Sequence, residues 1–282
     1  MCKLALTEQF APGIFIVWKK RNMKTSPGSW RKPPLAYVVA ELAISVYYAM
    51  PDALPDLQRK LFASYPKVLE GAENVILESG TLASQPTWQF ISESQTHGVY
   101  ISPRSISLHA TSYVNSSDFL TYWAIVLDAI QSIGLPVYVK SAGLRYFDLI
   151  VPEENRFPAD YISEKIQGLV PEGVVSVWSL WHGAFLFDRA QVSIRVSAPS
   201  PADFLFPPEL RMLPLKTSQI IRDAEQKRKE GKLTGFIDTE CMRMVERTFS
   251  ASDLLADFTD MHEFTSQSFR AVLSPLAEKE WK

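Results

Sequence analysis

One strongly apolar stretch follows Pro33 and Pro34 and runs over residues 35–48, with Glu41 as its single charged residue. Each proline fixes its own φ at about −65° and favours an extended conformation in the residue before it. The stretch is rich in β-branched, aromatic and alanine residues, which is typical of a strand covered on both faces. We therefore predict a central strand that buries Glu41. A buried carboxylate needs a partner, and we take Arg145 as the first candidate.

The first half of the chain shows helical spacing in two places and short alternating runs between them. Apolar residues at helical spacing predict a helix over residues 51–62 and a second one that Ser116 or Ser117 can cap and that ends at Gly134. Turn residues separate strands predicted over 87–93, 99–102 and 105–110, which favours an antiparallel meander. A long strand is predicted over 137–151. Residues 67–85 show no clear period and are predicted to be a loop.

The second half has a different order of elements. We predict a short helix over 160–166, strands over 174–182, 185–187, 191–197 and 233–245, and helices over 217–232 and 252–273. The proline-dense segment 199–208 is predicted to be a connector. The pattern indicates an α+β protein with antiparallel sheet packed against helices, divided into an extension at 1–30 and α+β halves at 31–152 and 153–282. The halves suggest a duplicated unit, although no sequence repeat supports it.

Composition narrows the function classes. The 282 residues include 29 basic and 31 acidic side chains, so no overall charge attracts nucleic acid or an anionic membrane. Cys2 and Cys241 lie far apart and fit a reducing compartment, which indicates a cytoplasmic protein. The apolar residues 11–18 are too short to span a bilayer, and basic residues follow them, so we expect neither secretion nor a membrane anchor. Residues 1–22 differ from the rest, and a start at Met23 or an added extension remains open.

Several short motifs resemble a sporadically distributed family of bacterial proteins of unknown function, whose members open with Pro-Pro-Leu and a valine-rich strand that carries a glutamate. The matching positions are Pro33, Pro34, Leu35, Val38, Val39, Glu41, Ile101, Ser102, Ile106, Ser107, Leu108, Tyr113, Gly143, Leu144, Arg145, Tyr146, Asp238, His262 and Phe269. Family members more often have an acidic residue soon after the leucine, where this chain has Ala36 and Tyr37. The resemblance covers about residues 30–275. It implies an architecture and a bacterial cytoplasmic setting, but no catalytic residue.

The charged residues of the predicted strands are weak candidates for a catalytic site. Asp238 and Glu240 lie two apart in a strand, so both carboxylates point to one face and are spaced to share a divalent cation. No local spacing supplies further ligands, and a solvated face is the simpler interpretation; we therefore predict no metal site. Arg145 lies in an apolar strand, where its guanidinium needs an ion-pair partner such as Glu41, Asp238 or Glu240, or an anionic ligand.

The remaining candidates are isolated histidines, a basic segment and an aromatic cluster. His97, His109, His182 and His262 lack metal-site spacing, and we predict structural or exposed roles for them. Acidic residues interrupt the basic segment 216–232, which predicts a solvated helix. With 12 glycines and no Gly-rich phosphate loop, we predict no cofactor. The aromatic cluster around Trp178 and Trp181 is predicted to pack in the core, or to mark a partner surface with Arg195 if it is exposed.

The function that we predict from these patterns is protein binding without catalysis. A sheet covered on one face by helices would present its other face to a protein partner or to a second copy of the chain. A defence- or toxin-associated accessory subunit fits a sporadic distribution by analogy. The alternative is a metal-dependent enzyme that acts on a phosphorylated or nucleotide substrate, with Asp238 and Glu240 on the metal and Arg145 on phosphate. Nucleic-acid binding would require Arg195, Arg222, Lys227 and Arg228 to align on one surface.

Overall fold

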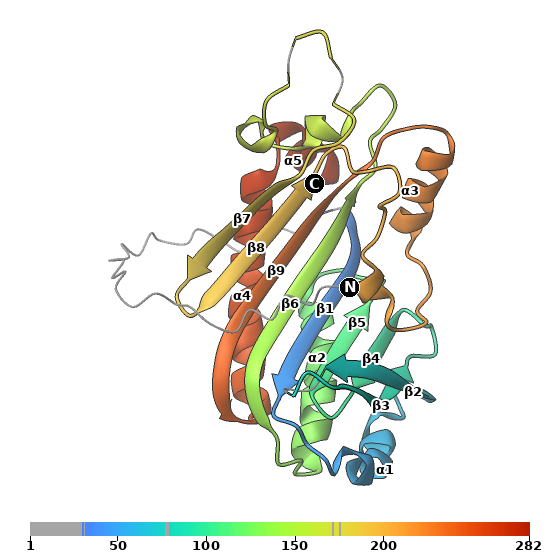
Figure 1. Ribbon diagram of the computed structural model, residues 1–282, viewed down its shortest axis with the longest axis vertical. Coiled ribbons are helices and arrows are strands. Elements are labelled where there is room, and N and C mark those ends of the chain that lie inside the picture. Colours follow the sequence, from blue (N-terminus) through green and yellow to red (C-terminus); the bar gives the residue numbers. More distant parts are fainter. Residues whose placement is uncertain (1–29, 31, 77–78, 171, 175) are drawn as a thin grey trace.

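A computed structural model describes residues 30, 32–76, 79–170, 172–174 and 176–282 of the chain. Within them, nine strands form one antiparallel sheet in the order β2-β3-β4-β5-β1-β6-β9-β8-β7 (Figure 1). The strands are β1 (Leu35–Ile44), β2 (Lys67–Ile76), β3 (Leu82–Ile91), β4 (His97–Ile101), β5 (Ser105–Ala110), β6 (Tyr138–Ile150), β7 (Trp181–Phe187), β8 (Ala190–Ser197) and β9 (Gly235–Thr248). The helices are α1 (Met50–Leu61), α2 (Ser116–Ser132), α3 (Gln219–Lys229), α4 (Ala251–Val272) and α5 (Pro275–Trp281), with short 3-10 turns at Pro158–Tyr161, Glu164–Ile166 and Pro208–Arg211. The predicted α+β class, with an antiparallel sheet packed against helices, is confirmed.

The β1 strand lies in the middle of the sheet, as its apolar sequence predicts. It pairs with β5 on one side and with β6 on the other. Val38, Ala40 and Leu42 are fully buried beneath the helices. The prediction that Glu41 is buried is wrong, because its side of β1 is covered only near the start of the strand and Glu41 itself is exposed.

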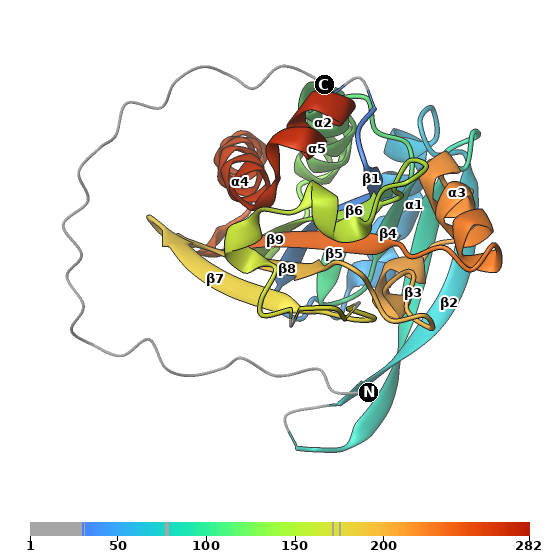
Figure 2. The same ribbon diagram turned by 90° about the horizontal axis from the view of Figure 1, so that it is seen from above.

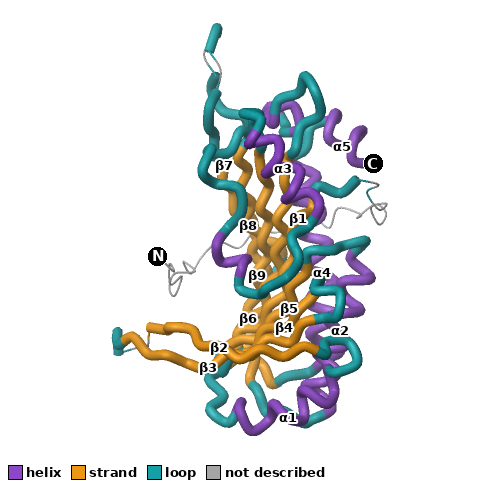
Figure 3. Tube along the Cα trace, turned by 90° about the vertical axis from the view of Figure 1, so that its right-hand side faces the viewer, coloured by secondary structure: helices purple, strands orange, loops and turns teal. Residues whose placement is uncertain are grey.

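The α2 and α4 helices cover one face of the sheet, which we call the helix face (Figure 3). Their contact includes the rings of Trp123 and Phe258, whose centroids lie 5.4 Å apart, edge to face. The residue that caps α2 is Asn115, whose side chain accepts a hydrogen bond from the backbone N–H of Asp118 at 2.9 Å. The predicted caps Ser116 and Ser117 are therefore wrong, since an extended Asn115 can reach the same orphan N–H group.

The opposite face of the sheet is only partly covered: Leu213 packs on Ile91 of β3 and Tyr100 of β4, and the fullest cover lies at the end that carries α3. There, α3 and the connector before it pack on an aromatic layer that includes Tyr37, Phe147, Phe206 and Phe236. Arg228 of α3 holds the connector in place by donating hydrogen bonds to the backbone carbonyls at positions 202 and 204, at 3.0 and 2.6 Å. We call the rest of this side the open face, and the β2–β3 hairpin projects from it in Figure 3.

The predicted loop over residues 67–85 is wrong, because residues 67–76 form β2 and residues 82–85 begin β3. The β2 strand is an edge strand whose sequence carries Lys67, Glu70 and Glu73, and nearly all of it is exposed or half-exposed. A strand without a buried face has no reason to alternate, so the sequence signal was absent. In the second half, the strand predicted over 174–182 is wrong for residues 176–180, which are irregular; β7 starts at Trp181 and continues through Gly183.

The sheet is continuous across the predicted boundary between the two halves, because β6 pairs with β9 from Tyr138 to Ile150. Figure 2 shows α2, α4 and α5 together on one side of the strands from both halves. A division into related halves stays a prediction. The predicted extension at 1–30 lies outside the described residues apart from Trp30, whose ring contacts those of Phe269 and Trp281.

Candidate functional site

A charged cluster occupies the middle of the open face, between the aromatic layer under α3 and the exposed end of the sheet. Arg145 on β6 donates two hydrogen bonds, each 2.8 Å long, to the two carboxylate oxygens of Asp238 on β9. Arg195 on β8 pairs with the same carboxylate, and Glu209 accepts a 3.1 Å hydrogen bond from Arg145. The sequence-predicted residues Arg145, Asp238 and Arg195 therefore meet, and Glu240 lies directly opposite Arg145 in the ladder.

The cluster is held by its own opposite charges. The Asp238 side chain is 2% exposed, and that of Arg145 is 13% exposed. Burial disfavours the charged guanidinium, but the hydrogen bonds and charge of Asp238 outweigh burial, so the pKa of Arg145 is raised. Both carboxylate oxygens of Asp238 are engaged by guanidinium groups. The arrangement is that of a bidentate structural ion pair with a third, more exposed partner in Arg195.

Glu41 does not contact the cluster in the way we predicted. In the ladder Arg145 faces Val39, whereas Glu41 faces Gly143, one rung farther along the open face. The expected pairing of Glu41 with Arg145 is therefore wrong, because Asp238 already occupies the guanidinium. Among the residues that the structure describes, no group of three or more His, Cys, Asp or Glu side chains is arranged to hold a metal ion.

Beyond the charged cluster, the open face carries exposed apolar side chains on neighbouring strands. Leu186 on β7, Met242 and Met244 on β9 are 47%, 50% and 53% exposed. Gly143, Met242, Gln191 and Leu186 form one row across four strands. We call the side chains of Ala184, Leu186, Gln191, Met242 and Met244 the Met242 patch. Methionine is enriched at surfaces that adapt to a partner.

The two edges of the sheet differ in how they are protected. The seven residues of β7, Trp181–Phe187, include no Lys, Arg, Asp, Glu or Pro, whereas β2 carries Lys67, Glu70 and Glu73. The predicted partner residue Trp178 is 55% exposed, just before β7. Trp181 is half-buried and its ring lies 6.4 Å from that of Phe185, with both rings over the backbone of Gly183.

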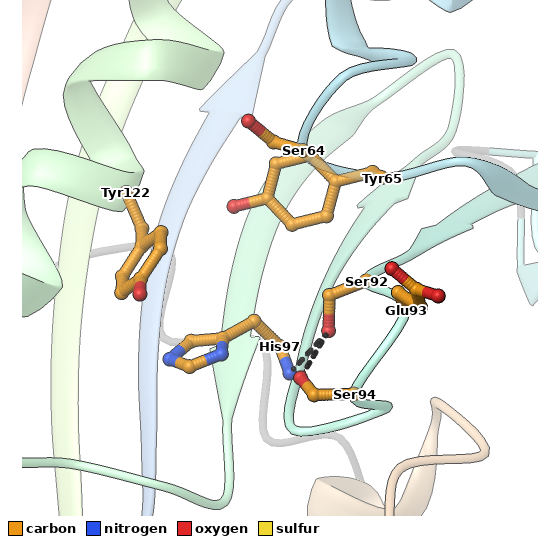
Figure 4. Close-up of a pocket in the computed structure, with 7 residues that line it drawn as sticks. All are labelled: Ser64, Tyr65, Ser92, Glu93, Ser94, His97 and Tyr122. Atoms are coloured by element: carbon orange, nitrogen blue, oxygen red, sulfur yellow. Dashed lines mark hydrogen bonds between the residues drawn. The ribbon is translucent and has the colours of Figure 1, made fainter.

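A cavity of about 520 Å³ lies at the other end of the molecule and was not predicted (Figure 4). It is lined by Ser64 and Tyr65 after α1, by Ser92, Glu93 and Ser94 in the β3–β4 turn, by His97 at the start of β4, and by Tyr122 on α2. Three segments far apart in sequence meet there. Only His97 was singled out from the sequence, because scattered serines and tyrosines give no motif.

The walls of this cavity are rich in hydroxyl groups. The Thr96 hydroxyl lies 3.0 Å from Nδ1 of His97 and 2.7 Å from the Ser94 hydroxyl, which lies 3.2 Å from that of Ser92. The His97 and Tyr122 rings have centroids 4.3 Å apart. Burial lowers the pKa of His97, and a hydrogen bond to the backbone at position 112 opposes this effect only partly. His97 is therefore neutral at pH 7.

The other three histidines make hydrogen bonds within the fold, which agrees with the structural or exposed roles that we predicted. His109 lies between the hydroxyls of Tyr37 and Ser107, at 3.1 and 2.8 Å. His182 contacts the Ser193 hydroxyl at 2.8 Å, and His262 lies 3.0 Å from the hydroxyl of a tyrosine on β6. Full burial lowers the pKa of His109 to about 3.

Comparison with protein-family models, with curated proteins and with solved structures finds no match for this chain. The resemblance to a bacterial family therefore stays a prediction. Among the described helices, none has the length and the apolar character needed to cross a membrane.

Proposed function

We propose that this protein is a non-catalytic binding protein that takes up an extended segment of a partner polypeptide along the edge of β7. The observation that carries the proposal is that the edge strand β7 contains no Lys, Arg, Asp or Glu and lies beside the Met242 patch. Main-chain hydrogen bonds along such an edge supply affinity, and side chains on the adjoining face supply specificity. The cytoplasmic setting and the role as an accessory subunit stay predictions.

The geometry of the β7–β8 hairpin leaves main-chain groups directed outward. The two strands are joined by Asp188 and Arg189 alone, and Phe187 pairs with Ala190. In a two-residue hairpin the residues that flank the turn exchange both hydrogen bonds, and the pattern then alternates along the strand. The N–H and C=O groups of His182, Ala184 and Leu186 consequently point away from β8. These three alternate residues of β7 can therefore form the main-chain hydrogen bonds of a β-ladder with one strand of a partner.

The composition of β7 supports the same conclusion. Proteins commonly protect an exposed edge strand with charged residues, proline or a bulge. The β2 edge has such charges and β7 has none. A strand paired to β7 would place alternate side chains beside Leu186 on the open face, where Met242 already offers an exposed apolar surface. The Arg195 guanidinium on β8, 41% exposed, lies along the same side and favours acidic positions in the partner strand.

The enzyme alternative has less support. Asp238 would have to bind a divalent cation, but two guanidinium groups occupy its oxygens. Arg145 would have to bind phosphate, but Asp238 and Glu209 already engage its Nε and Nη2 donors. Both residues are more readily explained as parts of one structural cluster.

The test is site-specific photo-crosslinking in the native host, with the photoreactive residue in place of Ala184. We expect a discrete covalent adduct that is lost in Leu186→Lys, which places a charge on the edge, and kept in Leu82→Lys, a matched control on an exposed leucine of β3. An adduct of twice the chain mass identifies a second copy as the partner; any other mass identifies a different polypeptide. The proposal fails if position 184 gives no adduct beyond that of a probe at Thr259 on the exposed side of α4.

A further inference from the structure

The cavity between α1, α2 and the β3–β4 turn has features of a ligand site that the proposed function does not use. We infer that it binds an uncharged sugar. Its volume of about 520 Å³ lies in the range of small-molecule sites. The cavity lies far from β7 in the sheet order, so the sugar site and the β7 edge can be tested independently.

The charge of the lining excludes anionic ligands. The seven lining residues include no lysine or arginine, and Glu93 is the single charged side chain among them. His97 is the remaining group that could become positive, and burial keeps it neutral at pH 7. A phosphate or carboxylate would find no positive partner in the lining, and the nearby Lys67 ammonium instead donates to the backbone carbonyl of Glu93 at 3.4 Å. The ligand is therefore neutral or cationic.

The most specific polar feature of the cavity is the hydroxyl of Tyr65. This side chain is 1% exposed, and its hydroxyl has no hydrogen-bond partner among the described residues. Figure 4 shows the hydroxyl pointing toward Tyr122, into the space that both tyrosines line. Buried hydroxyl groups are rarely left without a partner. The hydroxyl has almost no accessible surface of its own, so a ligand that carries hydroxyl groups can donate to it and accept from it once the rings of Tyr65 and Tyr122 separate to admit it.

The surroundings of Tyr65 match the two faces of a sugar ring. Ser64, Ser92 and Ser94 add hydroxyls that can donate or accept, and the β3–β4 turn holds the last two through their contacts with each other and with Thr96. Tyr122 is 38% exposed and offers an aromatic surface on which the C–H face of a pyranose can lie. The Glu93 carboxylate is an acceptor for further ligand hydroxyls.

A cationic ligand fits less well. Two tyrosine rings and a carboxylate would also attract an ammonium group. A quaternary ammonium makes no hydrogen bonds, and a primary ammonium donates but cannot accept, so either one would leave hydroxyl donors of Tyr65 and the serines without acceptors. The excess of hydroxyls over charges in the lining therefore favours the sugar.

The experiment is ligand-observed NMR with the full chain, using D-glucose, N-acetyl-D-glucosamine, maltose and trehalose as probes at up to about 20 mM. Glucose 6-phosphate and choline serve as comparators. We expect at least one neutral sugar to bind and to bind more tightly than either comparator. Tyr65→Phe should weaken binding by about tenfold or more, without lowering the melting temperature, since the lost hydroxyl has no partner in the fold.

Tyr138→Phe is the matched control, because Tyr138 is an exposed tyrosine on β6 outside the cavity, and it should bind sugar as the wild type does. The inference is overturned if all four sugars fail to bind, if either comparator binds as tightly as the best sugar, or if Tyr65→Phe binds like the wild type. Failure here leaves crosslinking at position 184 unaffected, so the two proposals are tested separately.

Discussion

The buried imidazole of His109 should make the protein sensitive to mild acid. His109 is 2% exposed and lies between the hydroxyls of Tyr37 and Ser107 beneath the aromatic layer, where the ring of Phe206 covers Tyr37. Burial lowers its pKa from 6.5 to about 3. A group with a lowered pKa in the folded state contributes stability that is present above its unfolded pKa and is lost as the pH falls toward its folded pKa.

The size of the effect follows from proton linkage. At pH 5 the histidine is about 97% protonated in the unfolded chain and about 1% protonated in the folded protein, given these two pKa values. Lowering the pH from 7.5 to 5 therefore removes about 2 kcal/mol of stability through His109 alone. His97 and His262 also have pKa values lowered by burial and add to the loss in the same direction.

The assay is urea unfolding of the wild type and of His109→Gln at both pH values. Gln cannot titrate, so the difference between the two proteins isolates His109 from the other histidines. We expect the wild type to lose about 2 kcal/mol more than His109→Gln over this interval. Equal losses in both proteins, or an NMR titration that places the pKa of His109 above about 5, would refute the reasoning.

Three further predictions concern residues of β6, β8 and β9. Asp238→Ala leaves a buried guanidinium without its partner and should cost about 3–5 kcal/mol in urea unfolding, whereas Arg195→Ala, 41% exposed, should cost under about 1 kcal/mol; equal costs would contradict the ion-pair assignment. Burial and the charge of Asp238 raise the pKa of Asp148, so the wild type should lose stability as the pH rises through that pKa; Asp148→Asn should melt higher than wild type at pH 8, and a lower melting temperature would count against this. Gly235→Ala should cost about 1–3 kcal/mol, because its Cβ would lie 2.7 Å from a backbone oxygen, while Gly143→Ala, which meets no atom within 4 Å, should stay within about 0.5 kcal/mol by the same assay.

The elements that sequence reasoning located best are those with one or two buried faces. β1, β5 and α2 were predicted within a few residues, because burial forces an apolar pattern on each of them. The exposed edge strand β2 was missed, since nothing in the fold requires its residues to alternate. Local pattern also placed Asp238 and Glu240 on one face, and the pairing of β6 with β9 confirms it.

The sequence alone could not show which carboxylate pairs with Arg145 in the candidate site. Arg145 had three possible carboxylate partners, and the selection of Asp238 over Glu41 depends on which residue lies one rung away on a neighbouring strand. That register is set by the whole sheet. The cavity around Tyr65 was missed for a related reason: its lining comes from three segments that meet only after the chain has folded.

The position of β9 between β6 and β8 has a consequence for the order in which the chain can assemble during synthesis. The β7–β8 hairpin is complete at Ser197, but the strand that joins it to the rest of the sheet begins at Gly235. At typical synthesis rates the ribosome needs about 2–8 s to add the roughly 40 residues between them. During that interval β8, with Val192 and Ile194, lacks the strand with which it pairs. Until β9 is made, the β7–β8 hairpin has two unpaired edges, one of which is the uncharged edge of β7 that we assign to a partner. We therefore expect chaperones to bind the nascent chain mainly during this interval.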